Sequence, residues 1–155
     1  MIETERLRLE PLSREHLEPW LRFMATPEAK AGTHSPEPLD DPARAAQVLD
    51  AFAANGEMYA AVVRETGEVA GFTGFVPRTM DWGDEVELGW LYLPEHWGRG
   101  YATEAAHALR PLRDGRVVSF IRTDNPASES VARKLGATQE RVFEWHGFET
   151  GYWVS

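Results

Sequence analysis

The sequence predicts a mixed α+β fold, a mostly antiparallel twisted sheet with helices on its faces. In the middle of the chain, strand-like segments follow one another with a short turn between them, which is typical of antiparallel pairing. The second half alternates strand, helix, strand and helix, which indicates that the strands flanking its first helix run parallel. A chain of 155 residues fits one domain, so we expect residues 1–155 to form a single mixed sheet with about four helices.

One strand and two helices are expected in the N-terminal third. Leu7-Arg8-Leu9 alternates between apolar and polar residues, as a strand does. Ser13 offers an N-cap for a helix whose apolar residues recur at helical spacing, namely Leu17, Trp20, Leu21 and Met24. Asp41-Pro42 begins the second helix, with proline in the first helical position, and Asn55-Gly56 ends it. The proline-rich residues 35–42 are expected to be a loop and not a domain boundary.

Three strands are expected next, over residues 58–63, 69–76 and 86–93. The turn Glu65-Thr66-Gly67-Glu68 joins the first two strands and makes them a hairpin. The third strand is apolar almost throughout, which suggests that both of its faces are buried.

Two helices and three strands complete the chain. The first helix is expected from Tyr101 to about Leu112, with an apolar stripe of Tyr101, Ala105, Leu109 and Leu112. Pro111 must end this helix early. A short buried strand, a helix opened by Asn125-Pro126 and two closing strands follow, over residues 117–121, 125–135, 141–145 and 151–154.

The chain is acidic and contains no cysteine. With 25 acidic against 16 basic residues and a net charge of −9, it is expected to bind neither nucleic acid nor membrane, and the charge suits a cationic substrate such as an amine. The absence of cysteine excludes disulfides and a cysteine nucleophile, and five scattered histidines without paired acids predict no metal site. No apolar run approaches the roughly 18 residues that span a bilayer, and the acidic N-terminus is unlike a signal peptide, so we expect a cytoplasmic protein.

The most informative segment is a glycine turn between the third central strand and the next helix. Gly98 and Gly100 let the backbone turn sharply and approach a ligand closely. The unpaired N–H groups of the following helix point into the same space, so turn and helix together predict an anion site that suits a phosphate. Arg99 adds a positive charge, unless it faces solvent.

Two common phosphate-binding motifs fail against this segment. A P-loop requires G-x-x-x-x-G-K-[ST], which is absent. A dinucleotide fingerprint requires glycine or alanine where the chain has Thr103, and an acidic residue near the position that Phe120 occupies. A nucleotide-dependent enzyme is therefore disfavoured.

Three linked segments resemble one family. Residues 97–102, Trp-Gly-Arg-Gly-Tyr-Ala, resemble the [R/Q/W]-x-x-G-x-G/A pyrophosphate loop of the GNAT superfamily of N-acetyltransferases. Residues 87–90, 102–105 and 5–9 resemble its branch of ribosomal-protein-alanine N-acetyltransferases. Asp124-Asn125-Pro126-Ala127-Ser128, with the segment that follows it, resembles the family's later cofactor segment. The resemblance covers nearly the whole chain, in order.

The resemblance implies that acetyl-coenzyme A binds between two diverging strands. Its pantetheine arm would bond to the backbone of Trp90, Leu91 and Tyr92. Its pyrophosphate would be held by the amides of the turn, which are those of Gly98, Arg99, Gly100, Tyr101, Ala102 and Thr103. Asn125 has two interpretations that stay open: a side-chain contact to the pantetheine arm, as in the family, or an N-cap before Pro126.

The catalytic residues do not carry over from the family. Many members have a tyrosine seven residues after the asparagine, where this chain has Ala132, and some have a glutamate at the position of Phe120. Glu87 is our candidate for taking the proton from the amine, directly or through water, against the alternative of an ordinary strand-end carboxylate. Ser128 is a candidate donor to the sulfur, against a backbone bond within its helix.

The sequence thus predicts an N-acetyltransferase that moves an acetyl group from acetyl-coenzyme A to a primary amine by direct attack. The acceptor is a small-molecule amine or a peptide N-terminus, by resemblance to the branch. The alternative is a non-catalytic module that binds or senses acyl-coenzyme A, because the tyrosine is missing. Trp82, in a turn, is expected to line the acceptor pocket or to cover a neighbouring subunit in a possible homodimer.

Overall fold

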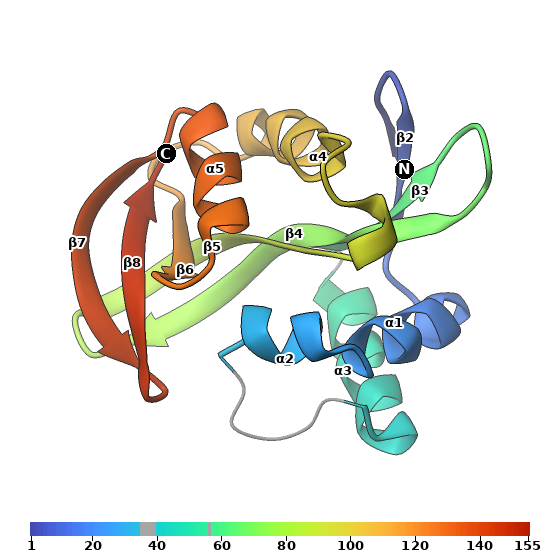
Figure 1. Cartoon of the computed structure of the whole chain (residues 1–155), viewed down its shortest axis with the longest axis horizontal. Helices are drawn as coiled ribbons and strands as arrows, with labels where there is room; N and C mark the ends of the chain where they lie inside the picture. The colour runs from blue at the N-terminus through green and yellow to red at the C-terminus, as the bar shows by residue number, and fades with distance from the viewer. Residues whose placement is uncertain (35–39, 56) are drawn as a thin grey trace.

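The computed structural model describes residues 1–34, 40–55 and 57–155, and its eight strands form one sheet (Figure 1). The strands are β1 Ile2–Glu3, β2 Leu7–Pro11, β3 Met58–Val63, β4 Val69–Met80, β5 Gly83–Tyr92, β6 Val118–Arg122, β7 Thr138–Trp145 and β8 Phe148–Val154. Their order across the sheet is β1-β2-β3-β4-β5-β6-β8-β7. Only β5 and β6 pair in parallel, and the other neighbours are antiparallel. The predicted mixed, mostly antiparallel sheet is confirmed.

The described residues form five α-helices, one more than predicted. They are α1 Leu17–Met24, α2 Pro27–Gly32, α3 Pro42–Asn55, α4 Tyr101–Leu109 and α5 Pro126–Lys134. Helices α1 to α3 lie on one side of the sheet, and α4 and α5 on the other (Figure 1). The missed helix, α2, is too short to show an apolar stripe, but Thr26 caps it by accepting a hydrogen bond from the Ala29 amide at 3.2 Å.

Several boundaries differ from the predicted ones. The hairpin of β4 and β5 extends to the two-residue turn Asp81-Trp82, because Gly83 adopts a φ of +129° that lets the chain reverse there. The predicted end of the second helix is confirmed at Asn55, while Gly56 and residues 35–39 of the predicted loop lie outside the described residues. None of the helices that the structure describes is long and apolar enough to cross a membrane.

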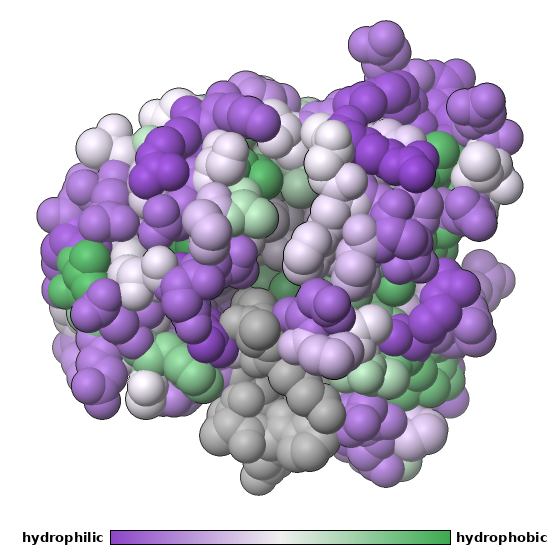
Figure 2. Space-filling model, in the orientation of Figure 1, coloured by the Kyte–Doolittle hydropathy of each residue, from purple (hydrophilic) through white to green (hydrophobic). Residues whose placement is uncertain are grey.

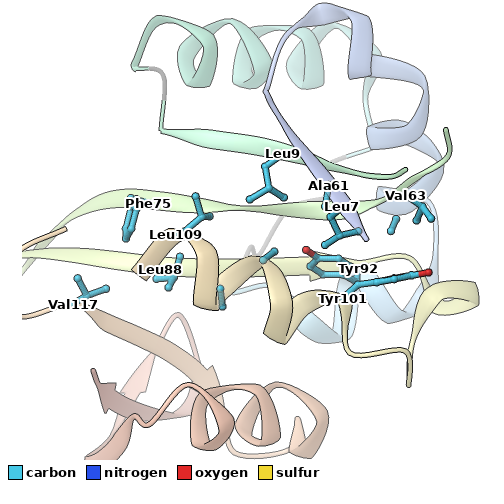
Figure 3. Close-up of a cluster of buried hydrophobic side chains, with 13 residues drawn as sticks. Leu7, Leu9, Ala61, Val63, Phe75, Leu88, Tyr92, Tyr101, Leu109 and Val117 are labelled. Atoms are coloured by element: carbon cyan, nitrogen blue, oxygen red, sulfur yellow. The ribbon is translucent and has the colours of Figure 1, made fainter. Parts of the chain in front are cut away.

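Helix α4 covers one face of the sheet with the predicted stripe, except at its end. Tyr101, Ala105 and Leu109 are buried in one cluster with strand residues such as Leu88. Figure 3 shows Tyr101, Leu109 and Leu88 in this cluster. Leu112 is instead 59% exposed, so its assignment to the stripe is wrong. The chain tightens into a 3-10 turn over Arg110–Leu112, whose three residues per turn rotate Leu112 out of phase with the α-helical stripe.

Helices α1 and α3 cover the opposite face with a second apolar cluster. Trp20 and Leu49 are buried in it, and the Trp20 ring meets Phe72 of β4 edge-on at 5.0 Å. The outside of the molecule is mostly hydrophilic on the face shown in Figure 2, in keeping with the net charge of −9. The first cluster, with Leu88 and Val117, packs where β5 and β6 meet.

Strands β5 and β6 separate soon after they meet. Their register contains the single pair Glu87 with Val118, next to which the Ser119 hydroxyl donates to the Leu88 carbonyl at 2.8 Å. Beyond this point the two strands run in the same direction without a further paired residue, so the backbone edge of β5 from Gly89 onward faces a gap in the ladder. The divergence that the resemblance implied is therefore present.

Candidate active site

The glycine turn has the backbone geometry that the sequence indicated. Gly98 and Gly100 have φ angles of +73° and +79°, in the left-handed region that glycine tolerates. Gly100 is the N-cap of α4 and offers no side chain to the helix. The first helical bond runs from the Glu104 amide to the Gly100 carbonyl at 3.0 Å, so the amides of residues 101–103 have no acceptor within the helix. This end of α4 can hold an anion.

The turn is braced by residues near the N-terminus of the chain. The Glu104 carboxylate accepts hydrogen bonds from the Thr4 hydroxyl at 2.6 Å, the Arg6 amide at 2.8 Å and Arg6 Nε at 2.7 Å. Arg6 Nη1 also donates to the Arg99 carbonyl at 2.7 Å. Partial burial raises the pKa of Glu104, but the bonds from Thr4 and Arg6 outweigh it and leave the pKa below its usual value. Residues 5–9 resembled the family, but nothing in the sequence indicated this role.

A cavity of about 390 Å³ lies where β5 and β6 diverge, between the two strands and helices α1, α3 and α5. Five of the predicted site residues line it: Glu87, Trp90, Leu91, Asn125 and Ser128. The residues of the turn do not line the cavity and form a separate surface beyond the end of β5. Tyr92 does not line it either, because its carbonyl accepts a hydrogen bond from Trp97 Nε1 at 2.7 Å and its side chain is buried in the core.

Glu87, the predicted proton acceptor, is buried at the cavity wall and paired with a cation. Its Oε2 lies 2.6 Å from Arg78 Nε, and the whole residue is 7% exposed. Arg78 also lines the cavity and stacks over the Trp145 ring at 5.2 Å. The pair holds the carboxylate in one orientation at the point where β5 begins to leave β6.

Asn125 and Ser128 lie together at the first turn of α5. Asn125 Oδ1 accepts a hydrogen bond from the Ser128 amide at 3.2 Å, so the interpretation as an N-cap is confirmed. The cap uses only the oxygen, and no hydrogen bond in the described part of the chain uses the Asn125 amide nitrogen. The contact to pantetheine therefore stays a prediction compatible with the cap. The Ser128 hydroxyl likewise has no partner among the residues described.

The two positions at which the family often carries catalytic groups hold apolar side chains. Ala132 is fully buried against Ile121 and Trp153 and does not line the cavity itself. Phe120 lines the cavity and meets the Trp145 ring at 5.0 Å. Neither supplies a proton donor or acceptor.

His34 is a functional candidate that sequence reasoning missed. It lines the cavity, and its Nε2 lies 3.0 Å from the Thr150 hydroxyl. That hydroxyl donates its single proton to the Phe148 carbonyl at 3.0 Å, so it accepts from His34, which places the ring proton on Nε2 and a lone pair on Nδ1. No local pattern marked His34, because its partner Thr150 is far away in the sequence.

The surroundings of His34 keep its ring neutral. Burial, and then the positive charges of Arg122, His146 and Arg78, lower the pKa of His34 to about 4, with Asp124 acting in the opposite direction. At neutral pH the Nδ1 lone pair is thus available, and the described residues supply no hydrogen bond to it.

Trp82 does not line this cavity, and its predicted place in an acceptor pocket stays a prediction. Its ring packs against Phe143 at 5.2 Å and Tyr152 at 5.8 Å, with the Arg141 guanidinium 4.1 Å above it. The long β4–β5 hairpin carries Trp82 past β6 to the far strands of the sheet, which a turn assignment alone did not reveal.

The residues that the structure describes contain no group of three or more histidine or acidic side chains that could hold a metal ion.

Comparisons with known proteins agree with this geometry. A family model described as an acetyltransferase (GNAT) domain matches residues 6–138. The uncharacterized protein YkkB of Bacillus subtilis is 36% identical over 78 residues, 47% of this chain and 45% of that protein. The uncharacterized N-acetyltransferase YoaA of Bacillus subtilis is 25% identical over 97% of this chain and 90% of its own length. An acetyltransferase structure from Agrobacterium tumefaciens str. C58 has a TM-score of 0.81 at 32% identity, covering 99% of this chain and 92% of that one. The chain belongs to the GNAT family of acetyltransferases.

Proposed function

We propose that the protein transfers an acetyl group from acetyl-coenzyme A to a primary amine by direct attack of the amine on the thioester. One observation carries the proposal: β5 borders a cavity where it leaves β6, and the chain then enters a turn with unpaired amides at the start of α4. A cavity for the acyl group is thus joined along one strand to a site for phosphates.

The residues present fit coenzyme A. The amides from Gly98 to Thr103 would hold the pyrophosphate, and the backbone of β5 from Trp90 to Tyr92 would hold the pantetheine arm together with the Asn125 amide. The Tyr92 carbonyl already accepts a hydrogen bond from Trp97, so it would have to accept a second one from the pantetheine arm. The same fold occurs in RimL, a ribosomal L7/L12 alpha-N-protein acetyltransferase in complex with coenzyme A, with a TM-score of 0.79 at 19% identity, and this likeness supports the fold alone.

In the reaction the new N–C bond forms as the C–S bond breaks, and the coenzyme supplies the acetyl group and leaves as a thiolate. Glu87 would take the proton that the amine loses, directly or through water. The neutral Nδ1 of His34 is a second proton acceptor at the same wall. The Ser128 hydroxyl would donate to the departing sulfur. No covalent enzyme intermediate is required, and the chain has no cysteine to form one.

The domain organisation, location and partners of the protein are also part of the proposal. The family match and the single sheet support one domain over residues 1–155. We propose a cytoplasmic location, a small amine or a peptide N-terminus as acceptor, and no role for nucleic acid or membrane. A homodimer remains a prediction, for which the 41% exposure of Trp82 is the available support.

A non-catalytic module that binds acyl-coenzyme A is the second candidate, favoured by the buried Ala132 at the usual tyrosine position. Release of coenzyme A in the presence of an amine separates the two functions. Because the chain contains no cysteine, a thiol reagent detects only the released coenzyme and gives no protein background.

Binding is tested by thermal unfolding with acetyl-coenzyme A, ATP, NAD and NADP at matched concentrations. A ligand at about 100 times its dissociation constant stabilises the folded state by about 2.7 kcal/mol. We expect acetyl-coenzyme A to raise the unfolding temperature and the nucleotides to leave it unchanged. Equal stabilisation by ATP would mean that the site recognises only phosphate, and the pantetheine assignment would fall.

A further inference from the structure

The acceptor side of the cavity has one apolar wall and one polar wall. The apolar wall comes from the helices α1 and α3 and from β4, through Trp20, Val48, Phe52 and Val76. The polar wall comes from β4, β5 and the segment after α2, through Arg78, Glu87 and His34. An acceptor that reaches the thioester must touch both walls.

The charges at the polar wall are already neutralised. Glu87 is the only carboxylate among the described residues that line the cavity, and Arg78 pairs with it at 2.6 Å. Arg122, the other cation of the lining, holds both oxygens of Asp124 at 2.9 and 2.6 Å. His34 is neutral at physiological pH and offers a lone pair on Nδ1. The wall therefore provides for one amine, and its described residues leave no unpaired carboxylate for a second positive charge.

We propose that the acceptor is a primary amine carrying a compact apolar or aromatic body and no second positive charge. This inference rests on the proposed acetyl transfer and names its substrate class. The apolar body packs against Val48 and Phe52, and its single amine reaches the Nδ1 of His34 and Glu87 beside the diverging strands.

The physical reason is the cost of burying an unpaired charge. A second ammonium along the same acceptor would lie against the apolar side chains of Val48 and Phe52, with no carboxylate beside it among the described residues of that wall. The acidic surface attracts cations at long range, but its carboxylates other than Glu87 lie outside the described lining. The cavity wall, and not the net charge, then selects the acceptor.

The test uses two amines that differ by one charge, hexylamine and 1,6-diaminohexane, with coenzyme A release as the readout. We expect kcat/KM for hexylamine to exceed that for the diamine by at least about tenfold. Equal or faster reaction of the diamine would overturn the inference and leave acetyl transfer intact. Absence of release with any amine would overturn acetyl transfer and the inference together.

A charge placed on the apolar wall should reverse the preference. Phe52→Glu supplies the missing carboxylate, so the ratio of hexylamine to diamine kcat/KM should fall by more than about tenfold. Ala51→Glu is the matched control, since it adds the same charge to the exposed side of α3 one residue away and should leave the ratio unchanged. Val48→Glu repeats the test at a second lining position if Phe52→Glu does not fold, as judged by loss of a cooperative thermal unfolding transition. A ratio that does not move in a folded variant of this wall would contradict the inference.

Discussion

The glycine turn at the start of α4 and the acceptor cavity differ in what makes them. The turn is made of backbone: two glycines at positive φ, free amides, and a brace from Thr4 and Arg6. The acceptor cavity is made of side chains that come from α1, α3, β4, β5 and the segment before residue 35. The glycine turn, which would bind the coenzyme, thus forms from residues that are neighbours in the sequence. The acceptor cavity, which would select the amine, forms only when distant segments of the chain pack together.

The largest expected effect concerns the side-chain region. Glu87→Gln should lower kcat/KM by about 10²–10⁴, as is typical when a proton acceptor is removed, while acetyl-coenzyme A still stabilises the protein. Glu85→Gln is the control, because Glu85 lies on the same strand but bonds Trp82 and does not line the cavity. A loss of less than about tenfold would show that positioning, or His34, supplies the rate.

A substitution in the glycine turn should have a smaller effect, on the affinity for acetyl-coenzyme A. Gly100→Val should raise the dissociation constant of acetyl-coenzyme A more than tenfold, about 1.4 kcal/mol, because a β-branched residue avoids the φ of +79° that this turn requires. Gly67→Val matches it, since Gly67 has a φ of +76° in the β3–β4 turn, and should cost stability without weakening binding. An unchanged dissociation constant in folded Gly100→Val would sink the assignment of the turn.

The brace of the turn should matter less. Glu104→Gln removes a partly exposed ion pair with Arg6, for which we expect a loss of affinity below about fivefold, or less than about 1 kcal/mol. The same carboxylate should affect stability in acid. The pKa of Glu104 is lower in the folded protein than the 4.5 of the unfolded chain, so Glu104 stabilises the fold above pH 4.5. This stabilisation is lost as the pH falls through the pKa of the folded protein. Urea unfolding between pH 3 and pH 6 should therefore show less acid dependence in Glu104→Gln than in Glu140→Gln, whose pair with Arg116 lies elsewhere. Identical acid dependence in the two variants would argue against the brace.

The effect that should be absent at neutral pH is a pH dependence of stability at His34. The pKa falls from 6.5 in the unfolded chain to about 4 in the folded one, so the unfolded state binds the proton first between these values. Stability should hence decline as pH falls through this window, and His34→Gln should remove part of the decline, whereas His107→Gln on the exposed side of α4 should not. Titration of His34 near pH 6.5 by NMR would contradict the burial and the neutral tautomer described above.

Local patterns predicted the fold well where local physics decides it. Strand β3 occupies the predicted residues, and α5 begins at Asn125-Pro126 because the capping oxygen and the proline both favour that start. Leu112 was placed wrongly because the helix changes type at Pro111, which a 3.6-residue period does not represent.

The site could be predicted only in part, for the same reason. Glycine is the residue that most readily adopts a positive φ, so Gly98 and Gly100 indicated the turn from the sequence alone. His34 becomes distinctive only through Thr150, and the pairing of the predicted Glu87 with Arg78 appears only once the neighbouring strand is in place. Side chains that meet through the fold leave no spacing pattern along the chain.

Hydrogen–deuterium exchange with and without acetyl-coenzyme A tests the central claim most directly, namely that the backbone of the turn and of β5 holds the coenzyme. We predict slowed exchange of the amides of Tyr101 to Thr103 and of Trp90, because these amides gain acceptors from the ligand, with no change along α3. Slowed exchange along α3 with an unchanged turn would place the coenzyme in the acceptor cavity and contradict the account.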